Sequence, residues 1–301
     1  MSDVVILLVQ QVIVMAALMV IGFIAFRTKL INAEGVKQMS NIALYVATPA
    51  MVLNSFIAEF SSEKLAKAGW SFLLTGVMVV FGWTLIHTIF RKLSNIGKFA
   101  VIFCNVGFMG IPLVQMVLGQ EAVFYMAMVV AMMTFVTFTY GMFLISGDRK
   151  MMSLKKVITN PPIIAVFAGL LVYCLQIPVP SIIQRTCSML SNITGPLSMM
   201  ILGSYLAEAD LKEVFGTKET YQMLAGRLVL MPLMMLVVLK LLPASLNEIK
   251  AVILIAATTP VATALGMFSQ IYGRNYAYGA GVVSISTILS LITMPLFLAL
   301  L

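Results

Sequence analysis

The sequence predicts an all-α integral membrane protein, and three observations support this fold class. Apolar residues make up 61% of the 301 residues and charged residues make up 10%, and the mean hydropathy is +1.05. A soluble globular domain has about 45–50% apolar and about 25% charged residues, so this chain has too few charges to cover a surface in contact with water. Apolar stretches of about 20 residues, the length that crosses a bilayer, follow one another along the chain.

Ten such stretches predict ten transmembrane helices. They run near 4–26, 38–58, 68–90, 97–118, 121–146, 161–177, 184–207, 220–242, 249–271 and 276–300. Arg27 and Lys29 follow the first stretch at once, and no small-residue cleavage site is present. We therefore expect the first stretch to remain as a span and not to be removed as a signal peptide.

The distribution of basic residues predicts the orientation in the membrane. The loops after odd-numbered stretches contain thirteen Lys and Arg residues, whereas the N-terminus and the loops after even-numbered stretches contain five. Basic residues are enriched in cytoplasmic loops, so we expect both termini outside and the 147–160 loop in the cytoplasm, in the cell inner (plasma) membrane. These loops account for the net charge of +8, and no nucleic-acid partner is expected.

The 147–160 loop divides the chain into two sets of five stretches, 1–146 and 161–301. With an odd number of spans in each half, the halves insert in opposite orientations and form an inverted repeat, a common plan of secondary transporters. Matching landmarks support this interpretation, because Pro49 and Pro196 lie inside the second and seventh stretches and an Ala-Glu pair ends each of these stretches.

Sequence motifs of enzymes are missing. The chain has one histidine, which excludes an H-E-x-x-H zinc site, and it has no Walker loop and no G-x-S-x-G. We expect no enzyme activity, no metal site and no cofactor apart from a coupling H⁺ or Na⁺. The acidic residues lie in loops or at the ends of stretches, which argues against a proton relay through a buried carboxylate.

Two ionisable residues lie within the stretches themselves. His87 is near the cytoplasmic end of the third stretch, where we expect an interfacial side chain and not a proton acceptor. Arg227 lies about two turns into the eighth stretch, and we expect its side chain to reach the cytoplasmic surface. The alternative for Arg227 is a cation that draws anions into a cytoplasmic vestibule.

The fourth stretch contains the segment CNVGFMGIPL, which predicts a helix broken near the middle of the membrane. Pro112 removes the hydrogen bond to the carbonyl of Phe108, and Gly107 and Gly110 relax the adjacent backbone. Groups freed inside a bilayer must find partners or line a wet cavity, and Asn105 supplies both a donor and an acceptor. We expect the second half-helix to start near Pro112. The alternative is an ordinary proline kink.

The ninth stretch contains the corresponding segment TTPVATALG. Pro260 frees the carbonyl of Ala256, and the hydroxyls of Thr258, Thr259 and Thr263 can replace lost backbone bonds. Two spans interrupted by Gly and Pro at corresponding positions indicate a transporter binding site. If they cross, two half-helix N-termini converge, which favours an anion such as a carboxylate. Freed carbonyls would instead favour Na⁺.

The string Asn105-x-x-x-Met109-Gly110-Ile111-Pro112-Leu113 resembles the crossover motif of the auxin efflux carrier family, which includes the plant PIN-FORMED carriers and many short bacterial carboxylate carriers. The segment NIALYVATP at 41–49, Pro260 and the 268–272 region are similar to the same family, so the resemblance extends over essentially the whole chain.

This resemblance implies a ten-helix inverted repeat with broken, crossing helices 4 and 9, as in bile-acid symporters and sodium/proton antiporters. Helices 1, 2, 6 and 7 would form a scaffold that dimerises, and helices 3–5 and 8–10 would form a transport domain that moves as an elevator. The expected substrate-binding residues are Asn105, Gly107, Gly110, Pro112, Thr258, Thr259, Pro260, Thr263, Tyr45, Asn54, Tyr125 and Asn192.

Two departures from the plant members bear on the substrate. Leu265 stands where they carry a second proline in the helix 9 crossover, and the third stretch offers only His87 where they carry an acidic and a basic residue. We therefore expect a carrier of small organic anions, malate- or malonate-like dicarboxylates or monocarboxylates, as a homodimer in the bilayer. The alternatives are a sodium-coupled symporter of the same fold and a membrane scaffold or receptor-like subunit without transport.

Overall fold

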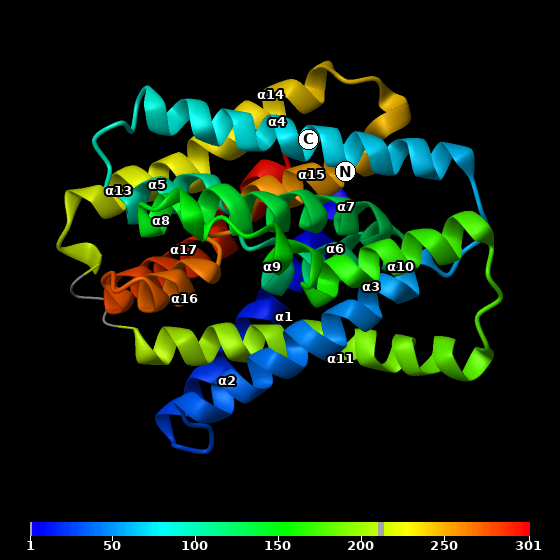
Figure 1. Cartoon of the computed structure of the whole chain (residues 1–301), viewed down its shortest axis with the longest axis horizontal. Coiled ribbons are helices and arrows are strands. Elements are labelled where there is room, and N and C mark those ends of the chain that lie inside the picture. The colour runs from blue at the N-terminus through cyan, green and yellow to red at the C-terminus, as the bar shows by residue number, and fades with distance from the viewer. Residues whose placement is uncertain (1, 210–213) are drawn as a thin grey trace.

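The computed structural model describes residues 2–209 and 214–301, and every regular element in these residues is a helix (Figure 1). Within these described residues, five helices are long and apolar enough to cross a membrane: Gln10–Arg27, Ser62–His87, Gln120–Ser146, Lys218–Leu241 and Ala277–Leu298. A sixth is counted if Arg149–Ile158 and Pro161–Leu175, which are bent by 44°, form one span. The prediction of an all-helical, multi-pass membrane protein is confirmed.

Helices also cover the other apolar stretches, where they are interrupted or carry more polar residues. In chain order the elements are α1 (Ser2–Arg27), α2 (Ala33–Ile42), η1 (Ala43–Ala47), α3 (Thr48–Phe56), α4 (Ser62–His87), α5 (Asn95–Ile102), η2 (Val106–Gly110), α6 (Ile111–Leu118), α7 (Gln120–Val136), η3 (Thr137–Gly141), α8 (Met142–Ser146), η4 (Arg149–Met151), α9 (Leu154–Ile158), α10 (Pro161–Leu175), α11 (Ser181–Glu208), α13 (Lys218–Ala225), η5 (Gly226–Leu230), α14 (Met231–Leu241), η6 (Ala244–Leu246), α15 (Asn247–Thr258), α16 (Ala264–Ile271) and α17 (Tyr276–Leu298).

Side chains that precede several helices fix where these helices begin. Asn32, Ser61, Ser94 and Asn275 each accept a hydrogen bond from a backbone amide in the first turn of the helix that follows. Such caps satisfy amides that have no partner within the helix. The helix starts are therefore encoded locally, by a polar residue directly before each apolar segment.

Wide π-helical turns lie directly before three prolines. The turn η1 precedes Pro49, η2 precedes Pro112 and η5 precedes Pro232. A proline in a helix lacks the amide that would bond to the carbonyl four residues earlier and clashes with that carbonyl. A π turn adds one residue to the helical turn, which gives the proline ring room, so the helix continues through each of these prolines.

α1 and α11 approach each other very closely. A Cβ atom on Gly22 would lie 2.1 Å from the carbonyl oxygen of Met200, and a Cβ on Gly203 would lie 1.9 Å from that of Met19. Ser204 Oγ donates a hydrogen bond to the carbonyl of Gly22 at 3.2 Å. Small residues at such positions let membrane helices pack backbone against backbone, so α1 and α11 form one tightly joined pair.

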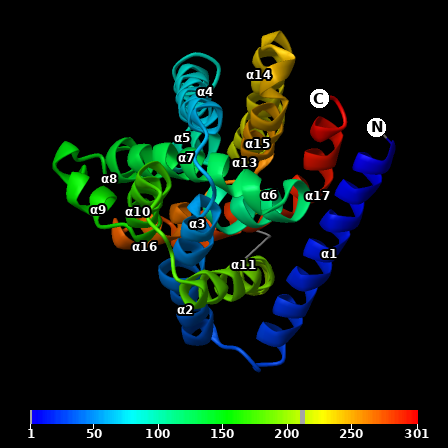
Figure 2. The ribbon, with the colours of Figure 1, turned by 90° about the vertical axis from the view of Figure 1, so that its right-hand side faces the viewer.

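The interrupted helices occupy the middle of the molecule. In Figures 1 and 2, α2 and α11 lie along one side and α4 and α14 along the opposite side, with α5, α6 and α15 between them. The ends of α1 and α17 that carry the two termini lie close together in both views. Most buried apolar side chains form one continuous cluster around the central helices.

Candidate functional site

The first helix interruption lies between α5 and η2. Phe103 has extended backbone (φ −91°, ψ 123°) and ends α5. Asn105 starts the next half-helix, because its Oδ1 accepts a hydrogen bond from the amide of Phe108 at 3.2 Å. The second half-helix therefore begins at Val106. The expectation that it starts near Pro112 is wrong, because η2 accommodates that proline and the break comes earlier.

The second interruption follows α15. Thr259 adopts extended backbone (φ −64°, ψ 149°) directly before Pro260. The hydroxyl of Thr258 donates to carbonyls one turn earlier in α15, both at 2.9 Å, and the hydroxyl of Thr259 donates to the carbonyl of Ala256 at 2.8 Å. The hydroxyl of Thr259 thus occupies the carbonyl of Ala256, the acceptor that the missing amide of Pro260 leaves free. Thr263 is half-buried just before α16.

The two interruptions meet and pair. Cys104 and Val261 form an isolated antiparallel bridge. The amide of Asn105 donates to the carbonyl of Pro260 at 2.8 Å, and the amide of Ala262 donates to the carbonyl of Phe103 at 3.0 Å. Both unwound segments thus satisfy part of each other's backbone, which a bilayer requires of any non-helical segment.

Asn105, at this crossing, carries a side-chain donor that has no partner. Its side chain is 3% exposed, and its Nδ2 is buried without a hydrogen-bond partner. A Cβ atom on Gly107 would meet nothing within 4 Å, whereas a Cβ on Gly110 would lie 2.4 Å from Met126 and 3.5 Å from Thr259. A buried donor without a partner, on the residue that starts a half-helix, is an arrangement that fits an anion.

Serines of α17 contact both broken helices at the crossing. The amide of Val261 donates to Ser286 Oγ at 3.1 Å, and Ser290 Oγ lies 3.8 Å from the sulfur of Met109 in η2. Sequence reasoning missed these serines. The available signal was the run of small polar residues in the last apolar stretch, all buried: Ser284, Ser286, Thr287 and Ser290.

Arg227 lies at the crossing and is completely buried, with 0% exposure. Its Nε donates to the carbonyl of Thr259 at 3.1 Å, and its terminal nitrogens donate to the carbonyls of Ile102 at 3.4 Å, Ala256 at 3.5 Å and Ala257. The expectation that this side chain reaches the cytoplasmic surface is wrong, and so is the alternative of a cation in an open vestibule. Carbonyls freed by the two breaks supply its partners inside the protein.

The other predicted site residues lie at varying positions around the crossing. Pro112 is buried on α6, and a Cβ on Gly195 of α11 would lie 3.6 Å from its ring. Tyr45 on η1 is 55% exposed, Asn54 on α3 is half-buried and Asn192 on α11 is exposed. These last three residues lie on helices outside the two unwound segments.

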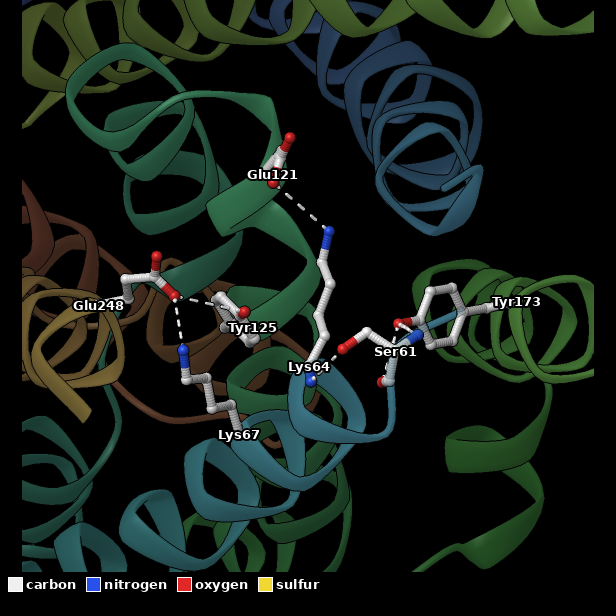
Figure 3. Close-up of polar contacts among 7 residues, drawn as sticks. All are labelled: Ser61, Lys64, Lys67, Glu121, Tyr125, Tyr173 and Glu248. Carbon is white, nitrogen blue, oxygen red and sulfur yellow. Dashed lines mark hydrogen bonds and ion pairs between the residues drawn. The ribbon is translucent and has the colours of Figure 1, made fainter. Parts of the chain in front are cut away.

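Tyr125 belongs to a separate polar cluster (Figure 3). Its hydroxyl donates to Glu248 at 3.5 Å, and Glu248 pairs with Lys67 at 3.4 Å, while Lys64 pairs with Glu121 at 3.6 Å. These contacts join the first two turns of α4 and of α7 to the first turn of α15. Glu248 lies in the first turn of α15, whereas the crossing follows its last turn, and twelve helical residues span about 18 Å.

Acidic groups and histidine are not buried at the crossing in the part of the chain with described side chains. No Asp or Glu is buried among the residues with described side chains. His87 is exposed, and its Nδ1 lies 2.8 Å from the carbonyl of Trp83. The described residues also contain no group of three or more His, Cys, Asp or Glu residues placed to hold a metal ion. The polar side-chain groups described at the crossing are thus an amide, hydroxyls, the thiol of Cys104 and one guanidinium.

A helical membrane protein with two interrupted helices crossing at a buried polar site has the general plan of a transporter. The chain matches the model of the family described as "Membrane transport protein" over residues 5–152 and 148–298, and it belongs to that family. The resemblance to the auxin efflux carriers is thereby confirmed.

Two relatives support this assignment over nearly the full length. The chain is 24% identical over 294 residues to a Rhizobium meliloti protein named "Putative malonate transporter", which covers 92% of this chain and 90% of the relative. It is 23% identical over 303 residues to a protein of Methanocaldococcus jannaschii named as an uncharacterized transporter, with 95% and 96% covered.

Proposed function

We propose that this protein is a secondary transporter of small organic acid anions and that the substrate carboxylate binds at the helix crossing. The observation that carries the proposal is the buried Nδ2 of Asn105, a donor without a partner, placed at the start of the half-helix that begins with η2. A carboxylate there would accept this hydrogen bond and lie at the positive end of the helix. No metal site or cofactor is part of the proposal.

The polar groups of the crossing favour an anion over a cation. Among the residues with described side chains, no buried Asp or Glu is present to attract Na⁺ or to carry a proton. Backbone carbonyls of the unwound segments are the other ligands that Na⁺ uses in such folds. Here Pro260 accepts from the amide of Asn105, and Arg227 donates to Thr259 and Ile102. Sodium coupling is therefore the second candidate.

The proposed cycle is an elevator with alternating access. We propose a ten-span inverted repeat made of residues 1–146 and 161–301, joined by the 147–160 loop in the cytoplasm and with both termini outside the inner membrane. α1, α2–α3, α10 and α11 would form the scaffold of a homodimer, and the remaining helices would carry the crossing across the membrane. The tight contact between α1 and α11 suits a fixed scaffold.

The few polar contacts described between the proposed scaffold and the proposed transport domain support an interface along which the two could move apart. Gln115 of α6 donates to Ser191 of α11 at 3.0 Å, and Gln120 of α7 donates to the carbonyl of Met51 in α3 at 3.2 Å. Both hydrogen bonds join uncharged groups, so each breaks at a modest cost of about 1 kcal/mol.

The class of substrate is a small mono- or dicarboxylate. The amide of Asn105 without a partner and the half-helix N-termini suit a carboxylate group. The relative named for malonate transport makes malonate the first probe. We expect purified protein to gain thermal stability with malonate, because a ligand that binds only the folded state stabilises it by mass action. Absence of any shift across malonate, malate, succinate and acetate would contradict the proposal.

A further inference from the structure

The guanidinium of Arg227 joins the ends of both broken helices. Its partners include the carbonyl of Ile102, the last residue of α5, and the carbonyls of Ala256, Ala257 and Thr259 at the end of α15. The C-terminal end of a helix carries a partial negative charge and exposes carbonyls without partners. One side chain from a third segment, η5, therefore covers the negative ends of two helices that are distant in sequence.

Only neutral side chains bond to the backbone amides at the positive ends of the second half-helices, in the residues with described side chains. Asn105, at the start of η2, offers a neutral amide, and Val261, before α16, is held by the hydroxyl of Ser286. Among the residues with described side chains, no carboxylate is buried near either end. Within this described part of the chain, the crossing thus contains one fully buried formal positive charge and two positive helix ends, without an acidic partner.

A buried charge without a counter-charge is costly, because solvation by water is lost. Hydrogen bonds to carbonyls offset part of this cost for Arg227. An anion bound on the opposite side of the crossing would offset more, since charges interact strongly through a medium of low dielectric constant. The same arrangement would oppose the binding of a cation.

We propose that Arg227 is a positioning residue that locks the two broken helices together and supplies the positive charge balanced by the bound substrate, without touching it. This inference rests on the proposed function of anion transport. It makes the site selective for ligands with a negative charge and predicts that neutral amide analogues of the same shape are rejected.

The native cysteine at the crossing provides a readout of helix locking. Cys104 is 4% exposed and pairs with Val261 beside the carbonyls that Arg227 contacts. In a Cys174→Ser, Cys187→Ser background, Cys104 is the sole thiol. We would compare wild type, Arg227→Lys and Arg227→Gln by maleimide labelling of Cys104 below the unfolding temperature, and by the Kd for malonate and its neutral analogue malonamide.

Arg274 offers a matched control. It also donates to backbone carbonyls, those of Ile145 at 3.0 Å and Ser146 at 3.4 Å, but it is exposed at a helix end away from the crossing. Arg274→Gln therefore removes an arginine that also bonds to backbone carbonyls, but it leaves the charge at the helix crossing unchanged. We expect wild-type labelling of Cys104 and a wild-type Kd for malonate in this variant.

The two Arg227 variants separate locking from charge. We expect Arg227→Gln to label Cys104 about ten-fold faster and to weaken malonate binding about ten-fold or more, the scale of one charge acting through protein. Lysine keeps the charge but lacks the planar fork, so Arg227→Lys should also label faster yet keep the Kd within about three-fold. If Arg227→Gln does not fold, the Lys variant and the malonamide comparison carry the test.

Several results would overturn this inference. Wild-type labelling in both variants would remove the locking role, and a malonate Kd in Arg227→Gln equal to that of wild type would remove the charge role. Equal affinity of wild type for malonate and malonamide would also contradict it. Faster Cys104 labelling in the variants, together with no binding of any carboxylate by wild type, would support locking and overturn the proposed function instead.

Discussion

The backbone amide of Asn105 donates a hydrogen bond to the carbonyl of Pro260 at 2.8 Å, although the two residues lie in opposite halves of the chain. Each lies in the unwound segment between two half-helices. The contact fixes the start of one half-helix against the unwound segment of the other. The side chain of Asn105 is thereby held in the crossing with one amide hydrogen-bond donor unused.

Replacing Asn105 should abolish transport and leave the fold largely intact. Asn105→Ala removes the free donor and the cap on Phe108, which costs about 1 kcal/mol of stability, but it keeps the backbone bonds of the crossing. Asn105→Asp keeps the cap and adds a negative charge, so it should also fail to bind an anion. Uptake of labelled malonate into proteoliposomes is the measurement, with thermal unfolding as the control for folding. Undiminished uptake in both variants would refute the site.

Pro112→Ala should slow transport without preventing insertion. Alanine restores an amide that can bond to the carbonyl of Phe108, so the π turn of η2 no longer has a proline to accommodate and can tighten to an α turn. Tightening would rotate the start of the half-helix and move the Asn105 side chain. The matched control is Pro49→Ala, which follows the π turn η1 outside the crossing. Normal turnover in Pro112→Ala would show that the turn does not set the site.

Gly203→Val should destabilise the protein strongly. Any Cβ at this position would lie 1.9 Å from the carbonyl oxygen of Met19, so α1 and α11 must separate, and such overpacking costs about 1–3 kcal/mol or more. Gly69→Ala is the control, because a Cβ atom on Gly69 would meet nothing within 4 Å, and it should be neutral or slightly stabilising. A thermal unfolding midpoint in Gly203→Val equal to that of wild type would contradict the close packing.

Tyr125→Phe and Glu248→Gln should leave the affinity for malonate within about three-fold of wild type. The Tyr125 hydroxyl bonds to Glu248 at the outer start of α15 (Figure 3), and the Glu248 side chain is 65% exposed. Exposed ion pairs contribute about 0–1 kcal/mol, so stability should change little as well. A large loss of malonate affinity in Tyr125→Phe, measured by thermal-shift titration, would contradict this placement and show that Tyr125 belongs to the binding site.

Local sequence chemistry predicted the two breaks, and the family resemblance predicted that the broken helices cross, but the side chains of other helices that contact the crossing were not predicted. Proline, glycine and asparagine close together in the fourth stretch, and threonines around Pro260 in the ninth, have physical effects on their own backbone, so both interruptions were predictable. The boundaries of the breaks were harder to predict. The π turn η2 lets the helix continue through Pro112, so the break lies in the residues before Val106.

Arg227 shows where sequence reasoning fails. A cation two turns from a helix start usually extends to the nearest surface, and the sequence does not reveal that carbonyls from two other segments lie closer. Ser286 was missed for the same reason, since its partner Val261 is known only once the helices are assembled. The contacts of Arg227 and of Ser286 are determined by how the helices pack together, and not by the local preferences of the sequence.

The most direct test of the crossing is a cross-link between Cys104 and Val261→Cys in the Cys174→Ser, Cys187→Ser background. The two positions form a bridge flanked by both hydrogen bonds, and such opposed residues have Cα atoms about 4.5 Å apart, within the range for a disulfide. With a protease site inserted in the 147–160 loop, we expect iodine oxidation to keep the two cleaved halves joined until a reductant is added. Ile253→Cys, within α15, should give no link. Halves that separate in the Val261→Cys protein after oxidation would contradict the account.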